Sequence, residues 1–150
     1  MSKVLISFAT MSGNTQKVAD HIAKELTKNM PEIETKIIDM MELTEEQFIE
    51  YDLVILGSST WTDGDYNPIS LEFFSQLQGT NTDFSKFRFA IFGLGESYYP
   101  EYCTVVEKMA QVLKSKNGVI VGELLKLDGY VDDNMLSKAS EWSINVIHSL

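Results

Sequence analysis

The chain opens with the stretch VLISFATMSGNT, residues 4–15, in which a short apolar run leads directly into a polar loop. Residues 4–9 predict a buried strand. Residues 14–29 then carry Val18, Ile22, Ala23 and Leu26 at helical spacing, and Pro31 marks the end of that helix. A buried strand that feeds a helix through a few polar residues is the repeating unit of α/β proteins.

The same alternation continues to the end of the chain. Strands are expected at 34–39, 52–57, 87–93 and 119–127, the last one bulged or broken at Gly122, and helices at 68–78, 101–116 and 134–148. Strands that alternate with helices form a parallel sheet with helices on both faces. The pattern therefore predicts an α/β fold of three layers.

Size and charge limit the possible functions. A chain of 150 residues with 44% hydrophobic residues is expected to form one domain, 1–150. Asp and Glu number 22 and Lys and Arg number 12, which gives a net charge of −10. Such an acidic protein repels nucleic acids and anionic membranes, so we expect no nucleic-acid or membrane partner. We expect a monomer whose partners carry basic patches.

Cysteine content and hydropathy point to the cytoplasm. Cys103 is the only cysteine, which excludes an intrachain disulfide and suits a reducing compartment. Apolar stretches without a charged residue, such as 53–62 and 73–82, are far shorter than the roughly 20 residues that cross a bilayer. The apolar run 4–9 is also too short for the hydrophobic region of a signal peptide.

Three unusual loops follow the first, third and fourth predicted strands, where parallel sheets bind ligands. The first loop, residues 10–15, has three hydroxyls, an amide and a glycine, and it precedes a helix. Backbone amides at a helix start bind phosphate well, and a glycine lets the backbone approach closely. The same residues also suit an ordinary helix cap. The loop has neither the Gly-Lys-Ser/Thr of a Walker motif nor the Gly-x-Gly-x-x-Gly of a dinucleotide fold.

The second and third loops, residues 57–66 and 93–103, add aromatic side chains to the same edge. Trp61 comes soon after a buried strand, and Tyr98 and Tyr99 follow two glycines. Taken separately, each is also explained by an aromatic at the rim of a core or by an exposed glycine-rich connection. Together with the first loop, they predict a site for a planar heterocycle that carries a phosphate.

At this point the whole chain resembles the flavodoxin family, in particular the short-chain bacterial members. The resemblance rests on Thr10-x-Ser12-Gly13-Asn14-Thr15, on Ser59-Thr60-Trp61-x-Asp63-Gly64, and on Gly93-x-Gly95-Glu96-Ser97-x-Tyr99. It implies a five-stranded parallel sheet in the order 2-1-3-4-5 and one tightly but noncovalently bound FMN. It also implies an electron carrier rather than an enzyme, served by a reductase of the ferredoxin/flavodoxin-NADP type and by acceptor redox enzymes.

The resemblance also implies a role for each loop. Residues of the first loop would hold the phosphate, Trp61 would flank the inner face of the ring, and Tyr99, or else its neighbour Tyr98, would stack on the outer face. Backbone amides of the third loop would meet the pyrimidine edge, and Cys103 would be a buried packing residue. The full expected set is Thr10, Met11, Ser12, Gly13, Asn14, Thr15, Ser59, Thr60, Trp61, Thr62, Asp63, Gly64, Leu94, Gly95, Glu96, Tyr99, Tyr102 and Cys103.

Two sequence features bear on the redox potentials. Asp63, Asp65 and Glu96 lie in the ring-contacting loops, and carboxylates near a reduced, anionic flavin disfavour it. We therefore expect a low-potential carrier. Thr62 departs from the family pattern, in which a glycine commonly follows the tryptophan and lets the next peptide turn toward the flavin. A β-branched residue tolerates that backbone less well, so we expect weaker stabilisation of the one-electron-reduced state.

Other functions fit less well. A flavodoxin-like NAD(P)H:quinone reductase would need an added segment for its second substrate, and a dedicated reductant of one enzyme, such as a ribonucleotide reductase, stays open. A receiver domain would need carboxylates where Thr10 and Ser58 stand. His21 and His148 are expected on helices away from the loops, no spacing resembles a metal site, and the acidic run 42–50 is expected to be a solvated helix face.

Overall fold

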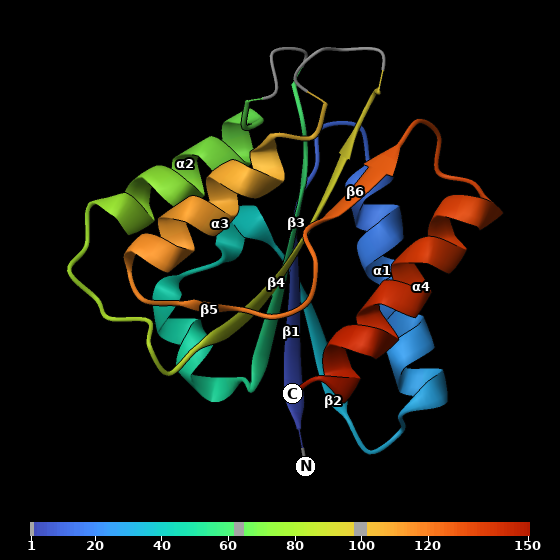
Figure 1. Ribbon diagram of the computed structural model, residues 1–150, viewed down its shortest axis with the longest axis horizontal. Helices are drawn as coiled ribbons and strands as arrows, with labels where there is room; N and C mark the ends of the chain where they lie inside the picture. The colour runs from blue at the N-terminus through green and yellow to red at the C-terminus, as the bar shows by residue number, and fades with distance from the viewer. Residues whose placement is uncertain (1, 62–64, 98–101) are drawn as a thin grey trace.

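The computed structural model describes residues 2–61, 65–97 and 102–150, and its strands form one parallel sheet (Figure 1). The order is β2-β1-β3-β4-β5, as the resemblance implied. Both β5 and β6 pair with β4, β5 at the start of β4 and β6 nearer its carboxyl end. The strands are β1 (Lys3–Ala9), β2 (Glu34–Asp39), β3 (Leu53–Ser59), β4 (Arg88–Gly95), β5 (Val119–Ile120) and β6 (Leu125–Asp128).

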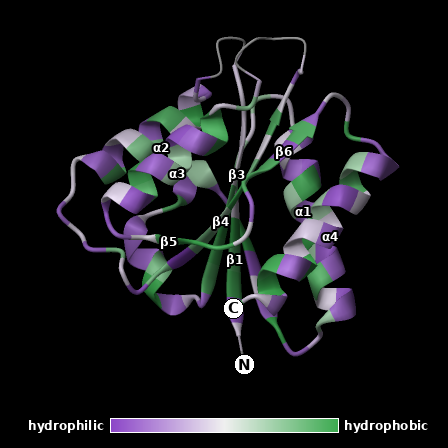
Figure 2. Ribbon diagram, viewed as in Figure 1, coloured by the Kyte–Doolittle hydropathy of each residue, from purple (hydrophilic) through white to green (hydrophobic). Residues whose placement is uncertain are grey.

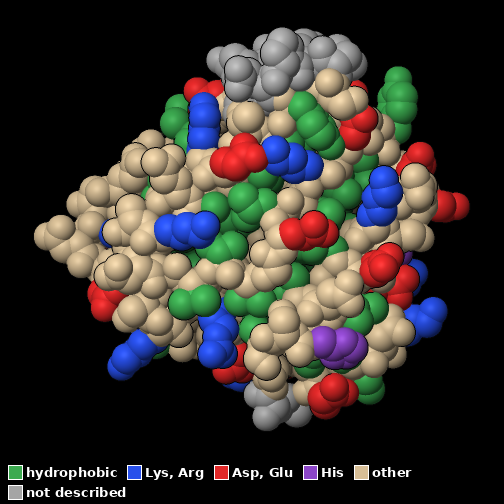
Figure 3. Space-filling view, in the orientation of Figure 1, with side chains coloured by type: hydrophobic (Ala, Val, Ile, Leu, Met, Phe, Trp, Pro, Cys, Tyr) green, Lys and Arg blue, Asp and Glu red, His purple; other side chains and the backbone are tan. Residues whose placement is uncertain are grey.

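Helices cover both faces of the sheet (Figure 1). The helices α1 (Asn14–Asn29) and α4 (Asp133–His148) lie on one face, and α2 (Pro68–Gln78) and α3 (Val105–Ser115) lie on the other. The central strands are hydrophobic along most of their length, while the helices alternate between apolar and polar residues (Figure 2). Charged side chains of both signs are scattered over the surface that Figure 3 shows.

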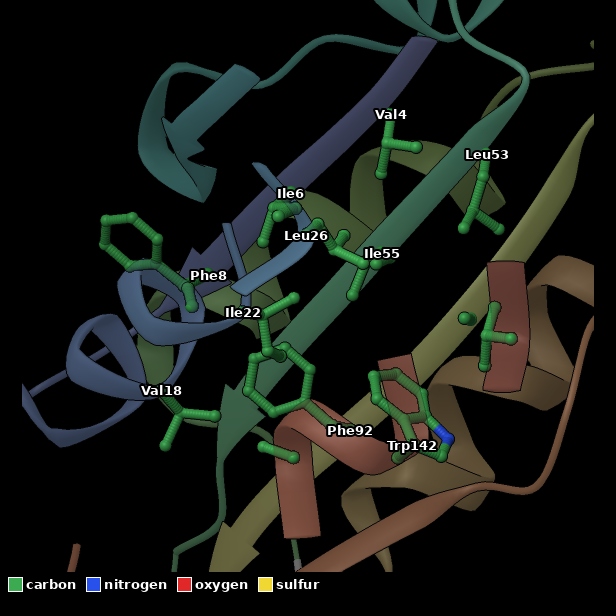
Figure 4. Close-up of a cluster of buried hydrophobic side chains, with 14 of the residues drawn as sticks. Val4, Ile6, Phe8, Val18, Ile22, Leu26, Leu53, Ile55, Phe92 and Trp142 are labelled. Atoms are coloured by element: carbon green, nitrogen blue, oxygen red, sulfur yellow. The ribbon is translucent and has the colours of Figure 1, made fainter. Parts of the chain in front are cut away.

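Each face of the sheet has its own apolar core, because successive side chains of a strand point to opposite faces. Val4 and Ile6 of β1 and Leu53 and Ile55 of β3 pack against α1, with Trp142 of α4 in the same cluster (Figure 4). The intervening side chains of the same strands pack against α2 and α3. Two buried faces explain why these strands read as continuous apolar runs.

Most predicted element boundaries are confirmed within a few residues. The helix at 14–29 has the predicted limits, and the strand expected at 119–127 is indeed broken, with Gly122 at φ 75° between β5 and β6. The helix expected at 101–116 was placed too early, because α3 begins at Val105 and Cys103 has a φ of 52°, outside the helical region.

The acidic run between β2 and β3 forms two short 3₁₀ helices rather than one α-helix. They are η1 (Met40–Glu42) and η2 (Glu45–Glu50). Phe48 in η2 is fully buried among four other phenylalanines, while most of the glutamates around it are exposed. The prediction of a solvated acidic face is therefore right for the carboxylates but misses this buried aromatic.

The register aligns the carboxyl ends of the three central strands. Ala9 of β1 lies beside Ser58 of β3, and Ser58 lies beside Gly93 of β4. The three loops singled out in the sequence therefore leave the sheet at one edge. Within the described part of the chain, no helix is long and apolar enough to cross a membrane.

Candidate functional site

The first loop leads from the end of β1 into α1. Gly13 is the N-cap residue at φ 92°, and it has no side chain to accept from the first amides of the helix. The first turn contains no acidic residue. Apart from its chain neighbours, no atom lies within 4 Å of the place where a Cβ on Gly13 would stand. A helix start that has no side-chain cap and has free space beside its N-cap residue can bind an anion.

The hydroxyls around this helix start add further donors. Thr10 Oγ1 accepts a hydrogen bond of 2.9 Å from the Gly13 amide, and its own proton stays available for a ligand. Thr15 Oγ1 is buried and makes no hydrogen bond to any described residue. A buried hydroxyl without a partner is costly, and a phosphate oxygen bound at this helix start would supply one. The site therefore fits a phosphate monoester held without a cationic side chain.

The second loop presents its tryptophan to solvent. Trp61 is 52% exposed although it follows a buried strand, so its indole is not part of the core. The loop closes on itself where Thr60 pairs with Tyr66 in an antiparallel bridge and the Trp61 amide donates to the Asp65 carbonyl at 3.1 Å. Thr62, Asp63 and Gly64, expected to belong to the cofactor site, lie outside the described residues.

Tyr66, the other aromatic of the second loop, belongs to the core instead. Its ring stacks on Phe74 of α2 at a centroid distance of 5.6 Å. Burial, with a smaller contribution from the charge of Asp65, raises the pKa of the Tyr66 hydroxyl to about 12. Trp61 is therefore the aromatic side chain of this loop that is free to contact a ligand.

The third loop begins where β4 ends at Gly95 and is anchored to β6. Asp128 accepts from the Ser97 amide at 2.8 Å and from the Ser97 hydroxyl at 2.6 Å. The Gly129 amide donates to the Gly95 carbonyl at 3.0 Å. Leu94 and Gly95 pair with β6 within the sheet, and Glu96 is the first, exposed residue beyond it. Tyr99 and Tyr98 lie outside the described residues.

The second and third loops are joined at their base, where the Thr60 amide donates to the Leu94 carbonyl at 2.9 Å. Tyr102 is partly buried at the far end of the third loop, and burial is the main cause that raises the pKa of its hydroxyl. The structure thus brings the described parts of all three loops to one edge of the sheet.

Cys103 is buried, as expected of a packing residue. Its Sγ lies 3.9 Å from the Leu127 carbonyl oxygen, and burial is the main cause that raises the pKa of the thiol to about 11. The thiol therefore stays protonated at neutral pH and is a poor nucleophile. His21 pairs with Glu25 on α1, His148 ends α4, and the described residues contain no cluster of metal-binding side chains.

The charges near the second loop differ from the expectation in one respect. Asp65 forms an ion pair of 3.1 Å with Lys108 of α3. A hydrogen bond from the Tyr66 amide, followed by the contact with Lys108, lowers the pKa of Asp65. Its negative charge is therefore partly offset. Glu96 is exposed and forms no salt bridge with any residue that the structure describes.

Sequence reasoning missed three residues that shape the site. Asn67 ties two strand ends together, Asp128 anchors the third loop, and Lys108 holds the second loop to α3. The Asn-Pro pair at the start of α2 is a recognisable helix-cap signal. Nothing local marks the other contacts, because their partners stand 31 to 58 residues away in the chain.

Comparison with known proteins agrees with this geometry. The family model described as Flavodoxin matches residues 6–142. Probable flavodoxin 2 of Bacillus subtilis is 35% identical over 129 residues, which make up 85% of this chain and 83% of that protein. The crystal structures of oxidised Flavodoxin 2 and oxidised Flavodoxin 1 from Bacillus cereus are 31% and 32% identical, with TM-scores of 0.89 and 0.86, and each comparison covers at least 99% of both chains. The chain therefore belongs to the flavodoxin family.

Proposed function

We propose that this chain is a low-potential one-electron carrier, rather than a stand-alone enzyme, and that it holds FMN across the three loops. Membership of the flavodoxin family makes it an FMN-binding electron-transfer flavoprotein. FMN supplies the redox chemistry when it is bound, and the protein sets its position and potentials. The assignment of individual residues to the cofactor, the low potential and a cytoplasmic location are our proposals.

The observation that carries the residue assignment is the glycine-capped start of α1 at the carboxyl edge of the sheet. Backbone amides of 11–15 and the side chains of Thr10, Ser12, Asn14 and Thr15 would hold the phosphate. No lysine or arginine takes part in this set. The helix dipole and several neutral donors can bind a dianion because each contributes a part of the compensation.

The indole of Trp61 would then flank the ring. It is half exposed, and it lies in a loop whose base is hydrogen-bonded to the third loop through Thr60 and Leu94. Amides at the end of β4, around Leu94 to Glu96, would meet the polar edge of the ring, and Tyr99 would cover its outer face. This arrangement orients the ring and excludes water from its faces.

The charge of the molecule favours a low potential and basic partners. A net charge of −10 and the exposed Glu96 disfavour the addition of negative charge to a bound flavin. Redox titration should place the final one-electron couple below that of free FMN. The same charge would steer a basic reductase or acceptor, so electron exchange should slow as ionic strength rises.

Cofactor binding is tested with the purified protein and a matched pair of variants. We expect a yellow protein that releases FMN in acid and whose apo form quenches flavin fluorescence on titration. Trp61→Ala should raise the Kd for FMN by about tenfold, since stacking of a base on an aromatic ring is worth roughly 1–3 kcal/mol. Ile49→Ala removes an even more exposed apolar side chain at the other end of β3 and should leave the Kd unchanged.

A colourless protein that takes up no FMN would overturn the proposal. Equal effects of the two substitutions would show that Trp61 is not a ring contact. Steady-state oxidation of NAD(P)H with a quinone separates a carrier from a quinone reductase, because a carrier without its partners should give no sustained turnover.

A further inference from the structure

Asn67 is the N-cap residue of α2. It precedes Pro68, the first residue of α2, and its Oδ1 accepts from the amides of Ile69 at 2.9 Å and Ser70 at 3.0 Å. Capping of this kind uses only the oxygen of the side chain. Asparagine is one of several residues that would serve, so the cap by itself does not explain this choice.

The amide nitrogen of Asn67 makes contacts that a cap does not need. Nδ2 donates to the carbonyl oxygen of Ala9 at 2.9 Å and to the hydroxyl of Ser59 at 2.8 Å. The hydroxyl of Ser58 is a longer neighbour at 3.3 Å. The side chain is fully buried, with a relative exposure of 0%. Both donors of a buried amide therefore bridge the ends of two strands.

These two strand ends are the starting points of two of the three loops. Ala9 is the last residue of β1 and directly precedes the first loop, where the phosphate would bind. Ser59 is the last residue of β3 and directly precedes Thr60 and Trp61 of the second loop. The start of α2 lies at the same edge of the sheet as both strand ends (Figure 1).

We propose that Asn67 is a positioning residue for FMN, which sets the separation between the first and second loops so that one molecule can bind to both. This inference rests on the proposed function, because it assumes that the phosphate and the ring bind where we place them. Two linked groups bind together tightly only if the spacing of their sites matches the link between them. A fixed spacing also lowers the ordering cost of binding.

FMN and riboflavin differ only in the phosphate, so loss of the Asn67 amide should affect their binding differently. Riboflavin uses the ring site alone, whereas FMN needs both sites in register. Asn67→Ser keeps a hydroxyl that can cap α2 but removes the amide that reaches Ala9 and Ser59. We expect the Kd for FMN to rise about tenfold and the Kd for riboflavin to rise no more than about twofold, as the loss of one or two hydrogen bonds allows.

Ser70→Ala is the matched control. It removes the hydrogen bond of 2.9 Å between Ser70 and Ser58 in the same buried network but leaves both donors of Asn67 in place. Urea unfolding of the apo forms should show that both variants are folded. The ratio of the Kd for FMN to the Kd for riboflavin should stay at the wild-type value in Ser70→Ala and should rise only in Asn67→Ser.

If Asn67→Ser does not fold, Ser59→Ala gives a second route, because it removes only the acceptor at the second loop. It should change the ratio in the same direction by a smaller factor. Equal changes for FMN and riboflavin, or no change, would reduce Asn67 to a helix cap and overturn the inference. Failure of the wild-type protein to bind FMN would instead overturn the proposed function, so the two failures are distinguishable.

Discussion

Gly57 shows how a single residue fixes the packing of two central strands. A Cβ at this position in β3 would lie 2.0 Å from Cζ of Phe92 in the neighbouring strand β4. The phenylalanine ring occupies the space that a side chain on Gly57 would need. Both residues are buried, so neither can move into solvent. Close packing leaves the core no room to absorb an added methyl group.

We therefore predict that Gly57→Ala lowers the free energy of unfolding by about 1–3 kcal/mol, the usual cost of overpacking a core. Urea unfolding of the apo protein measures the change. Gly79→Ala at the end of α2 is the control, because its Cβ would lie no nearer than 3.5 Å to another atom and its φ of −82° suits alanine. Equal stabilities of the two variants would contradict the prediction.

From the sequence, we expect Thr62 to affect the redox potentials of the bound flavin rather than the stability of the fold. A strained backbone at a non-glycine residue costs on the order of 1–3 kcal/mol. Thr62→Gly should therefore raise the first one-electron midpoint potential and lower the second, each by roughly 60 mV, which corresponds to a tenfold change in a one-electron equilibrium, so their separation should widen by about twice that amount. Spectroelectrochemical titration measures both potentials.

Thr82→Gly is a suitable comparison for Thr62→Gly, since Thr82 is exposed in the connection after α2 and bonds to Glu45. It should leave both potentials unchanged. A separation in Thr62→Gly that equals the wild-type value would mean that the residue after Trp61 does not limit the backbone near the flavin.

The short strand β6 anchors the third loop. Asp128 at its end holds Ser97 through two hydrogen bonds. Asp83 makes the same pair of contacts with Ser85, at 3.1 and 2.9 Å, in the connection before β4 at the opposite edge of the sheet. Among the residues that the structure describes, these are two similar exposed Asp–Ser contacts, of which one adjoins the proposed site and the other does not.

We predict that Asp128→Ala raises the Kd for FMN several-fold, because the third loop loses its anchor, while Asp83→Ala leaves that Kd unchanged. Fluorescence titration of the two apo proteins gives the comparison. Both variants should have similar urea midpoints, since both carboxylates are exposed. An increase of the Kd in both variants would indicate a general loss of negative charge or stability rather than a loop effect.

The elements also show which parts of the fold could be predicted from sequence. The helix at 14–29 was predictable because its apolar residues repeat at helical spacing, and the break at Gly122 was predictable because glycine marks it. The start of α3 was not, because Cys103 takes a positive φ that residues other than glycine rarely adopt. A local sequence pattern predicts the secondary structure of a segment when interactions within that segment determine it.

The candidate site could likewise be predicted only in part. Its loops could be located because parallel strands gather their carboxyl ends at one edge and because unusual residues follow three of them. The contacts that hold the loops in place could not, because the partners of Asn67 in β1 and of Asp128 in the third loop are distant in sequence. Such contacts depend on the assembled sheet, and no local propensity reveals them.

For the whole molecule, the net charge of −10 opposes compact folding at neutral pH. Hydrogen bonds lower the pKa values of three aspartates. The main donor is the Tyr66 amide for Asp65, the Asn117 side chain for Asp83 and the Ser97 hydroxyl for Asp128. The folded state therefore binds protons at these groups less readily than the unfolded state, whose Asp pKa is about 3.9. Their contribution to stability is complete above that pKa and is lost as the pH falls through the lower pKa values of the folded state.

These two effects predict a stability maximum between neutral and strongly acidic pH. Stability of the apo protein should rise modestly from pH 7 toward pH 5, as the falling pH reduces the net negative charge and its repulsion, and it should fall below about pH 4, as the contribution of the three aspartates is lost. Sodium chloride should raise the midpoint of urea unfolding at pH 7 and have a smaller effect near pH 5, because it screens repulsion that is weaker there. A stability that declines steadily from pH 7 downward would show that the aspartate contacts outweigh the repulsion even at neutral pH. A salt effect of equal size at both pH values would show that the net charge is not its cause.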